Sequence, residues 1–307
     1  MNLAAQVIWH LHSLALLLKK SKVPGSGRLA YFILDRLLKE SYMPIMVKTI
    51  HGFKLGIDPM KDQGVEREIF YSGTYESGVL SILEHLLKKG DVFVDVGANI
   101  GLMSIFAAQE VGPSGKVIAI EANPNTAEIL SRNLSINNLS SVQVMQCAIG
   151  NSLDSIKIYD NFDVNRGASS VIPPEKLTDS YQVSQTTLDK ALFGRLMPSI
   201  VKIDVEGAEL DVLLGSRELL SSLNPPIVVM ECSADYNIER PTELFNFFES
   251  LDNYKICKSL TGKAKVGKLK LIEKTKDMPK HDNIYCFPKA RLNDLITTEK
   301  SLFVDNF

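Results

Sequence analysis

Asp91-Val-Phe-Val-Asp-Val-Gly-Ala-Asn-Ile-Gly101 is the stretch that decides the fold of this 307-residue chain. The run 92–96 is β-branched or aromatic apart from one acid, which is typical of a parallel strand covered by helices on both faces. Gly97 and Gly101 then allow a sharp turn and a close approach of the backbone. The apolar run 102–108 predicts a helix, whose first free N–H groups favour an anionic or electron-rich ligand.

The spacing of these glycines indicates the kind of ligand. The pattern is G-x-x-x-G after Asp95, whereas a dinucleotide pyrophosphate is cradled by G-x-G-x-x-G, so a cofactor without phosphates is favoured. A side chain at Gly97 is expected to fill the space where a nucleoside packs against the loop. Glu121 closes the next apolar run after a turn-helix-strand interval, and at a strand tip it can accept both ribose hydroxyls.

A further buried strand, 199–204, leads into the second acidic stretch, Asp204-Val-Glu-Gly-Ala-Glu209. Ligands of open α/β sheets bind outside the carboxyl ends of the strands, near the switch in strand order. This rule places Asp204 and Glu206 beside Gly97. Glu209 is interpreted as a partner of the helix dipole, because a helix is expected to begin there and to continue through Leu219.

Val94-Asp-Val-Gly-Ala-Asn-Ile-Gly101, Glu121 and Val201-Lys-Ile-Asp-Val-Glu-Gly-Ala-Glu209 together resemble the FkbM-type family of S-adenosylmethionine-dependent methyltransferases. The resemblance spans roughly 52–287. It implies a Rossmann-like class I methyltransferase fold, which is α/β and doubly wound around a seven-stranded, mostly parallel sheet. It also implies S-adenosyl-L-methionine as cofactor and, mostly, methylation of hydroxyl oxygens. The expected acceptor is a small molecule or glycan that carries a sugar, lipid-linked or secondary-metabolite hydroxyl.

Methyl transfer from a sulfonium requires an aligned donor and acceptor and a group that handles the acceptor's proton. Asp204 and Glu206 are the predicted catalytic residues, since carboxylates can take a proton and also suit a cationic donor. Glu231, at the end of the strand 227–231, is expected either to bind the acceptor or to neutralise Lys202. Lys202 itself is interpreted as a structural residue that crosses either to a carboxylate or to the sheet edge.

The residues predicted to contact the cofactor lie in turns and at strand ends. The turn 73–76 matches the family pattern, so Tyr75 or Glu76 can meet the methionine end of the cofactor, unless Glu76 only caps a helix. The tetrad 147–150 is expected to line the adenine pocket, unless it is an ordinary strand end. The full predicted set is Glu76, Asp95, Gly97, Ala98, Asn99, Gly101, Glu121, Ala148 and Asp204.

Two loops receive an interpretation of their own. Residues 160–180 form a long loop that is read either as a lid over the acceptor, with Ser169 and Ser170 as acceptor-binding residues, or as a mobile surface excursion. The insert 258–280 is rich in lysine and poor in acids and aromatics, and is interpreted as a solvated hairpin loop between two antiparallel strands.

Four segments are expected along the chain. They are an N-terminal helical extension at 1–44, a β-hairpin with a helical lead-in at 45–90, the methyltransferase domain at 91–290 and a C-terminal tail at 291–307. Residues 1–20 have apolar positions at helical spacing but are too short and too interrupted for a membrane span or a signal peptide. An amphipathic helix is expected there, which packs on its own domain, on a partner subunit or on a membrane surface.

Composition limits the partners. The chain has 34 Lys and Arg against 36 Asp and Glu, so no nucleic-acid partner is expected. Its four cysteines form no C-x-x-C pair and lie in apolar runs, which is typical of reduced, buried thiols in a cytoplasmic protein rather than of metal ligands, and no metal is predicted.

Three alternatives to O-methylation remain open. An N-methyltransferase of the same fold is disfavoured because Asp204-Val-Glu-Gly differs from the Asn/Asp-Pro-Pro-Tyr loop that serves planar amines. A dinucleotide-dependent oxidoreductase is disfavoured by the missing G-x-G-x-x-G. A non-catalytic scaffold is disfavoured because the acids and glycines at the strand ends are intact.

Overall fold

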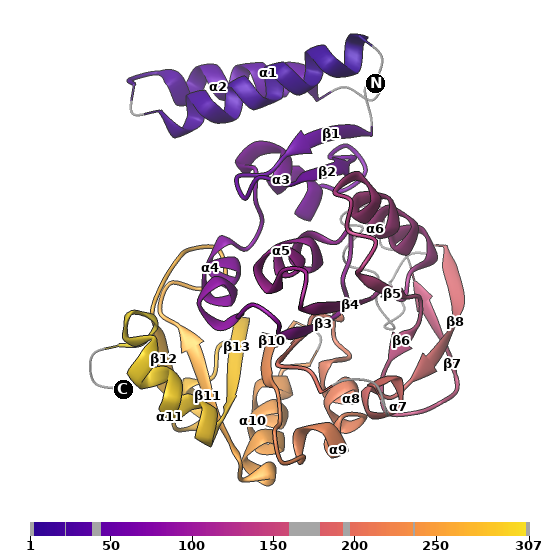
Figure 1. The fold of residues 1–307 in the computed structure, drawn as a ribbon, viewed down its shortest axis with the longest axis vertical. Coiled ribbons are helices and arrows are strands. Elements are labelled where there is room, and N and C mark those ends of the chain that lie inside the picture. The colour runs from indigo at the N-terminus through magenta and orange to yellow at the C-terminus, as the bar shows by residue number, and fades with distance from the viewer. Residues whose placement is uncertain are drawn as a thin grey trace.

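The structure is a computed structural model that describes residues 3–21, 23–38, 44–159, 179–192, 197–235 and 237–304. Its centre is an eight-stranded sheet of order β12-β11-β13-β10-β9-β3-β4-β5 (Figure 1). Five neighbouring strands are parallel: β5 (Gln143–Met145), β4 (Lys116–Ile120), β3 (Val92–Val96), β9 (Ile200–Ile203) and β10 (Ile227–Ser233). The antiparallel strands are β13 (His281–Pro288), β11 (Tyr254–Ser259) and β12 (Leu269–Ile272).

This sheet confirms the predicted class I methyltransferase fold and adds one strand to it. The additional strand, β12, lies in the insert 258–280, which was expected to be a loop, and it pairs with β11 at the sheet edge. From β3 the chain first winds outward through β4 and β5, and then returns to place β9 on the other side of β3. The switch in strand order therefore lies between β3 and β9, where Gly97 and Asp204 leave the sheet.

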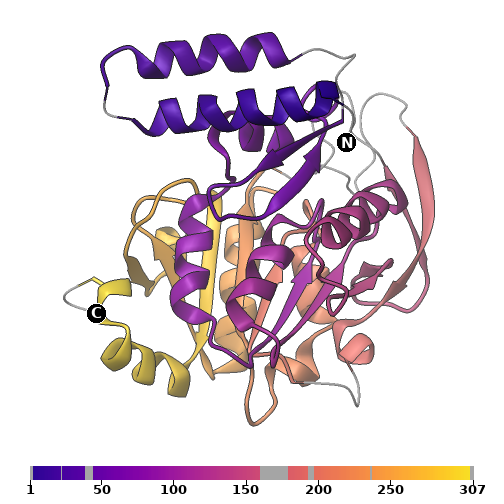
Figure 2. The same cartoon turned by 45° about the horizontal axis from the view of Figure 1, so that its top comes forward.

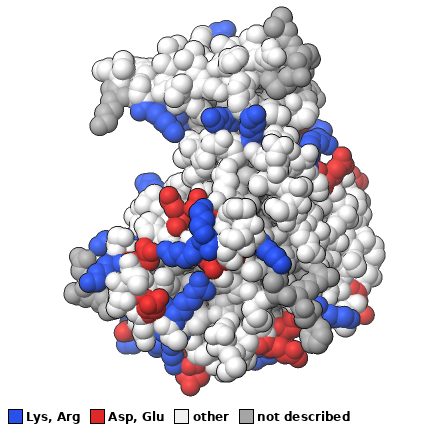
Figure 3. All heavy atoms as spheres, in the orientation of Figure 1, with Lys and Arg blue, Asp and Glu red and all other residues white. Residues whose placement is uncertain are grey.

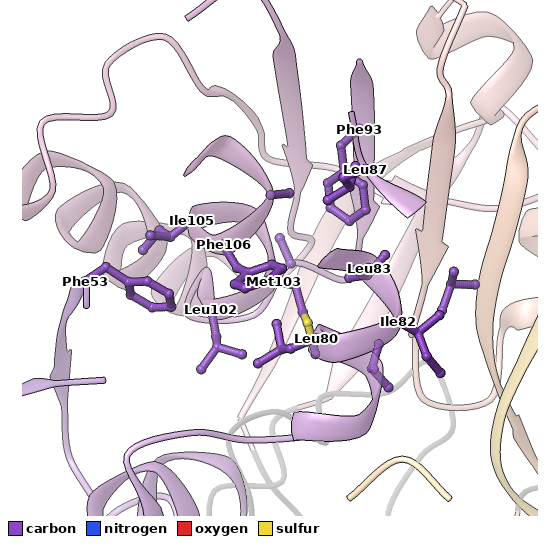
Figure 4. Packing of buried hydrophobic residues seen from close by; sticks show 14 of the residues in the cluster. Phe53, Leu80, Ile82, Leu83, Leu87, Phe93, Leu102, Met103, Ile105 and Phe106 are labelled. Atoms are coloured by element: carbon purple, nitrogen blue, oxygen red, sulfur yellow. The ribbon is translucent and has the colours of Figure 1, made fainter. Parts of the chain in front are cut away.

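Helices cover both faces of the sheet, so successive strand residues alternate between two cores. Phe93 points into the core formed with α4 (Ser77–Leu86) and α5 (Leu102–Val111), as Figure 4 shows. Val94 and Val96 point into the opposite core, which the helices α8 to α10 cover. On this side α8 (Glu209–Leu214), α9 (Arg217–Leu220) and α10 (Arg240–Leu251) follow β9 and β10.

The helix predicted to run on through Leu219 is two helices. It breaks at Gly215, where an added Cβ would lie 2.0 Å from the carbonyl oxygen of Gly150. The close approach of these two backbones explains the break. Gly150 follows β6 (Ala148–Ile149), which belongs to a second, three-stranded sheet with β8 (Ser180–Thr186) and β7 (Ser155–Tyr159).

The remaining elements follow in chain order. They are α6 (Pro124–Ile136), which the Asn123 side chain caps, then α7 (Leu188–Leu192), η3 (Thr275–Asp277), α11 (Lys289–Thr298) and η4 (Lys300–Leu302). The ring of Phe303, after η4, lies 6.1 Å from that of Phe287 in β13. The end of the described chain therefore packs on the sheet.

The N-terminal elements form a layer of their own above the sheet (Figure 2). A helical hairpin of α1 (Leu3–Lys20) and α2 (Ser26–Leu37) packs beside the predicted β-hairpin, β1 (Ile45–Lys48) and β2 (Lys54–Ile57), and beside α3 (Val65–Ser72). A buried His12 anchors it, since its Nε2 lies 2.8 Å from the carbonyl oxygen of Phe70. Burial lowers the pKa of His12.

The helical hairpin also exposes apolar side chains. Its surface in Figure 3 is largely uncharged, and Leu17 is 67% exposed while Phe32 is 54% exposed. These exposed side chains are compatible with the predicted contact of residues 1–20 with a subunit or a membrane surface, which stays a prediction. The cytoplasmic location also stays a prediction. Within the described residues no helix combines the length and the apolar character that crossing a bilayer requires.

Candidate active site

The site begins where β3 and β9 end side by side. The amides of Gly97 and Ala98 both donate to the carbonyl oxygen of Ile120, at 2.9 Å each, and the Asp204 amide donates to that of Val96 at 2.9 Å. Gly97 has φ +81°, and a Cβ there would lie 1.8 Å from the Asp204 carbonyl oxygen. A side chain at Gly97 would therefore collide with the neighbouring loop. Gly97 also lines the hollow beside Glu121, so the expectation that a side chain there fills the nucleoside space stays a prediction.

Glu121 and Asn99 form the next part of the site. The two Glu121 carboxylate oxygens accept the amides of Asn99 at 2.8 Å and of Asn123 at 2.9 Å. Burial raises the pKa of Glu121 to about 7. Asn99 adopts φ +48°, and its buried Oδ1 has no hydrogen-bond partner among the described residues. The two Glu121 oxygens have four lone pairs, of which the amides of Asn99, Asn123 and Ala122 use at most three, so Glu121 and Asn99 both keep capacity for a ligand.

A first hollow of about 640 Å³ opens beside Glu121. Apolar side chains of Ile120, Ile149 and Ile158 line it together with Ala148, as expected for the wall of an adenine pocket. Its polar rim holds Glu121 and Asn99. The orphaned Asn99 Oδ1, the Glu121 carboxylate and the apolar wall fit the adenosine half of S-adenosylmethionine. Within the described residues, no three His, Cys, Asp or Glu side chains converge as metal ligands.

A second hollow of about 610 Å³ adjoins the first. Gly97, Asn99, Asp204 and Glu206 line both hollows. The other polar residues of the second hollow are Tyr75, Glu76, Lys202, Glu231 and Lys263. The structure thus brings together the predicted cofactor residues Glu76, Gly97, Ala98, Asn99, Glu121, Ala148 and Asp204, the predicted catalytic residue Glu206 and the predicted acceptor residue Glu231.

Asp95 and Gly101 support the site from behind. Asp95 is fully buried, and its Oδ2 accepts the Ser104 hydroxyl at 2.6 Å. Gly101 has φ +95° and precedes α5, where a Cβ would lie 2.6 Å from Leu130. Neither residue lines either hollow. In this structure they shape the loop, and a direct contact with the cofactor stays a prediction.

Lys202 is paired with two acids, as its structural interpretation predicted. Its Nζ lies 3.0 Å from Asp204 Oδ2 and 3.9 Å from Asp95 Oδ1. Burial lowers the pKa of Lys202, but the charges of Asp204 and Asp95 outweigh burial and raise it. Burial would raise the pKa of Asp204, yet Lys202 lowers it overall. The pair is therefore held ionised at the floor of the second hollow.

Glu231 does not neutralise Lys202, because its partner is Lys263. The Lys263 Nζ lies 2.8 Å from Glu231 Oε1 and 3.1 Å from Glu76 Oε1. Burial and the charge of Asp204 raise the pKa of Glu76 to about 7, although Lys263 counteracts both. For Lys263 the interpretation of its insert as a solvated loop is wrong. No local pattern distinguishes this lysine from its neighbours, so sequence reasoning missed it.

The loop after β9 completes the site. Glu206 adopts φ +53° at the border of the two hollows. Glu209 is 1% exposed, and its carboxylate accepts the amides of Gly207 at 3.1 Å and of Val205 at 3.3 Å. Glu209 therefore holds the shape of the loop. Ser169 and Ser170 lie outside the described residues, so the acceptor lid stays a prediction.

The mostly parallel sheet, with two hollows at its switch point, defines an α/β fold of the class I methyltransferase type. A family model described as the Methyltransferase FkbM domain matches residues 95–254, more than half of the chain, and the chain belongs to this family. The predicted resemblance is confirmed.

Individual relatives are more distant. Over 195 residues the chain is 27% identical to methyltransferase sdnD of Sordaria araneosa, covering 53% of this chain and 71% of the relative. Over 160 residues it is 28% identical to hexuronic acid methyltransferase AglP of Haloferax volcanii, covering 52% and 64%. The crystal structure of methyltransferase FkbM from Methylobacillus flagellatus superposes with a TM-score of 0.42 at 17% identity, covering 72% of this chain and 52% of that one.

Proposed function

We propose that this chain transfers a methyl group from S-adenosylmethionine to a hydroxyl oxygen of a sugar, lipid-linked or secondary-metabolite acceptor. The observation that carries the proposal is the pair of adjoining hollows that share Gly97, Asn99, Asp204 and Glu206. One hollow suits a nucleoside, and the other is lined by carboxylates. A small-molecule donor and a polar acceptor can therefore meet at the shared residues.

The bound cofactor supplies an electrophilic methyl group on a sulfonium. The residues of this chain bind the donor and the acceptor, align them, and receive the proton of the acceptor hydroxyl. Glu121 accepts the ribose hydroxyls, while the carboxylates of Asp204 and Glu206 face the shared border and favour a cationic donor. A hydroxyl acceptor loses its proton during transfer and needs a hydrogen-bond acceptor nearby, and the second hollow offers several carboxylates for this purpose.

Isothermal titration with S-adenosylmethionine and, separately, with NADH tests the cofactor. Glu121→Ala removes a charged hydrogen-bond acceptor, which typically stabilises by about 1.5–3 kcal/mol, so binding of S-adenosylmethionine should weaken about 10-fold or more. Glu128→Ala is the matched control, because this side chain is 74% exposed on α6. It should bind like the unmodified protein. Heat with NADH alone would overturn the proposal in favour of an oxidoreductase.

The acceptor is then sought with methyl-labelled S-adenosylmethionine and a panel of neutral sugars, uronic acids and hydroxylated lipids. Mass spectrometry of the labelled product locates the methyl group. Label on an oxygen supports the proposal. Label found only on nitrogen when amines are added to the panel would establish the N-methyltransferase alternative instead.

A further inference from the structure

The loop between β11 and β12 is fixed against the start of α4. The Gly78 amide donates to the Lys263 carbonyl oxygen at 3.0 Å, and the Ser77 hydroxyl donates to that of Ala264 at 2.8 Å. A Cβ at Gly78 would lie only 2.4 Å from the carbonyl oxygen of Lys265. The loop therefore accepts hydrogen bonds at the helix N-terminus, where free donors need partners.

The loop is also braced internally. Its ends are joined by the Leu260 amide, which donates to the Lys268 carbonyl oxygen at 3.0 Å, and its tip by the Thr261 hydroxyl, which donates to that of Lys265 at 2.9 Å. Gly262 makes the turn with φ +75°. Lys263 thus extends from a supported turn, and its side chain is directed toward the two acids that it pairs with.

The ammonium of Lys263 lies between two acids from distant parts of the chain. The Glu76 side chain is 3% exposed and that of Glu231 is 15% exposed. The other cation of the hollow, Lys202, is already held by Asp204 and Asp95. Without Lys263, Glu76 would face the charge of Asp204 with Lys202 as the cation that remains, and Glu231 would lose its ion pair.

We propose that Lys263 is a positioning residue of the second hollow, and that its ammonium, paired with both Glu76 and Glu231, orients their carboxyl groups so that they accept the hydrogen bond of the acceptor hydroxyl. This inference rests on the proposed function, and it assigns the acceptor side of the site to a loop outside the parallel sheet. Lys263 acts through the two acids and does not touch the reacting atoms.

The pH at which Glu76 takes up a proton tests this role of Lys263, and the measurement needs no acceptor substrate. The groups that surround it are Lys263 and Glu231, Asp204 and Lys202, the neighbouring Tyr75, and Asn283 and Tyr285 of β13. An opposite charge at this distance typically shifts a carboxyl pKa by about 1–3 units. Loss of the Lys263 charge is therefore expected to raise the pH at which Glu76 ionises.

Infrared titration between pH 5 and 9 follows the protonated carboxyl band, and Glu76→Gln assigns that band to Glu76 by removing it. In Lys263→Met its midpoint should move up by about one pH unit or more. Lys263→Arg should keep the midpoint, because the charge is retained. Lys265→Met, on the exposed part of the same loop, should also keep it.

Gly78→Ala provides a second variant that leaves Lys263 in place but displaces its loop, so it should move the midpoint in the same direction as Lys263→Met. An unmoved midpoint in Lys263→Met would overturn the inference, as would an equal shift in Lys265→Met. Titration of each variant with S-adenosylmethionine separates the two proposals. If the unmodified protein does not bind S-adenosylmethionine, the proposed function is refuted. If it binds and the infrared midpoint of Lys263→Met is unmoved, only the role of Lys263 is refuted.

Discussion

Replacing Gly97 by alanine tests the contact between the ends of β3 and β9. The matched control is Gly52→Ala in the turn between β1 and β2. Gly52 has φ +95° and Gly97 has φ +81°, so alanine at either position adopts an unfavourable left-handed backbone at a cost of about 1–2 kcal/mol. Around Gly52 an added Cβ meets nothing within 4 Å, whereas at Gly97 it lies 1.8 Å from the Asp204 carbonyl oxygen.

The collision at Gly97 is with backbone, which cannot rotate away as a side chain can. Overpacking typically costs about 1–3 kcal/mol, so Gly97→Ala should lose about 2–3 kcal/mol more than Gly52→Ala in the free energy of unfolding. Urea unfolding of both variants without ligand, followed by circular dichroism, measures the difference from the transition midpoints.

Two results would refute this reasoning. Equal losses in the two variants would mean that the ends of β3 and β9 are not in contact. Unchanged stability in Gly97→Ala together with weaker binding of S-adenosylmethionine would mean that the glycine leaves room for the nucleoside and is not required by the contact with Asp204. The expected result is that both properties decline together.

Two further predictions concern buried charge. Lys202→Met leaves the buried Asp95 and the partly exposed Asp204 without their cation, and it should cost about 3–5 kcal/mol at pH 7. The cost should be smaller at pH 5, where the acids take up protons. Exposed Lys88→Met should cost under about 1 kcal/mol, and similar urea midpoints for the two variants would contradict this prediction. Burial raises the pKa of Glu121 from 4.5 to about 7, so its contribution to stability is complete below pH 4.5 and is lost as the pH rises to 7. Glu121→Gln should remove roughly 3 kcal/mol of that decline in a urea series across pH, and an unchanged slope would refute it.

The cofactor side of the site was predictable because its signals are local. The alternation of apolar residues identifies the strands at 92–96 and 116–120. The two glycines follow the first strand and Glu121 follows the second, and a parallel sheet brings these strand ends to one edge. The pairing of Lys202 with Asp204 also follows from local geometry, since residues two apart in a strand point to the same side.

The acceptor side was not predictable in the same way. Lys263 reaches Glu76 across 187 residues of sequence, and only the docking of its loop on Gly78 selects it from the lysines nearby. The strand β12 was missed because its four residues, two of which are leucines, lie in a lysine-rich stretch with a weak alternation. Asp204 was expected beside Gly97, but the collision of an added Cβ with the Asp204 carbonyl oxygen depends on the register in which β3 pairs with β9, which the sequence does not give.

The hairpin of β11 and β12, which carries Lys263, can be altered with less effect on the core than the central strands can. The donor hollow is built from the ends of central strands, so altering it disturbs the core itself. The loop at 260–268 joins two strands at the edge of the sheet. It lines the hollow with Lys263, and its carbonyl oxygens bond the start of α4. Under the proposed function, exchanging this loop is expected to change the acceptor while leaving the residues of the donor hollow in place.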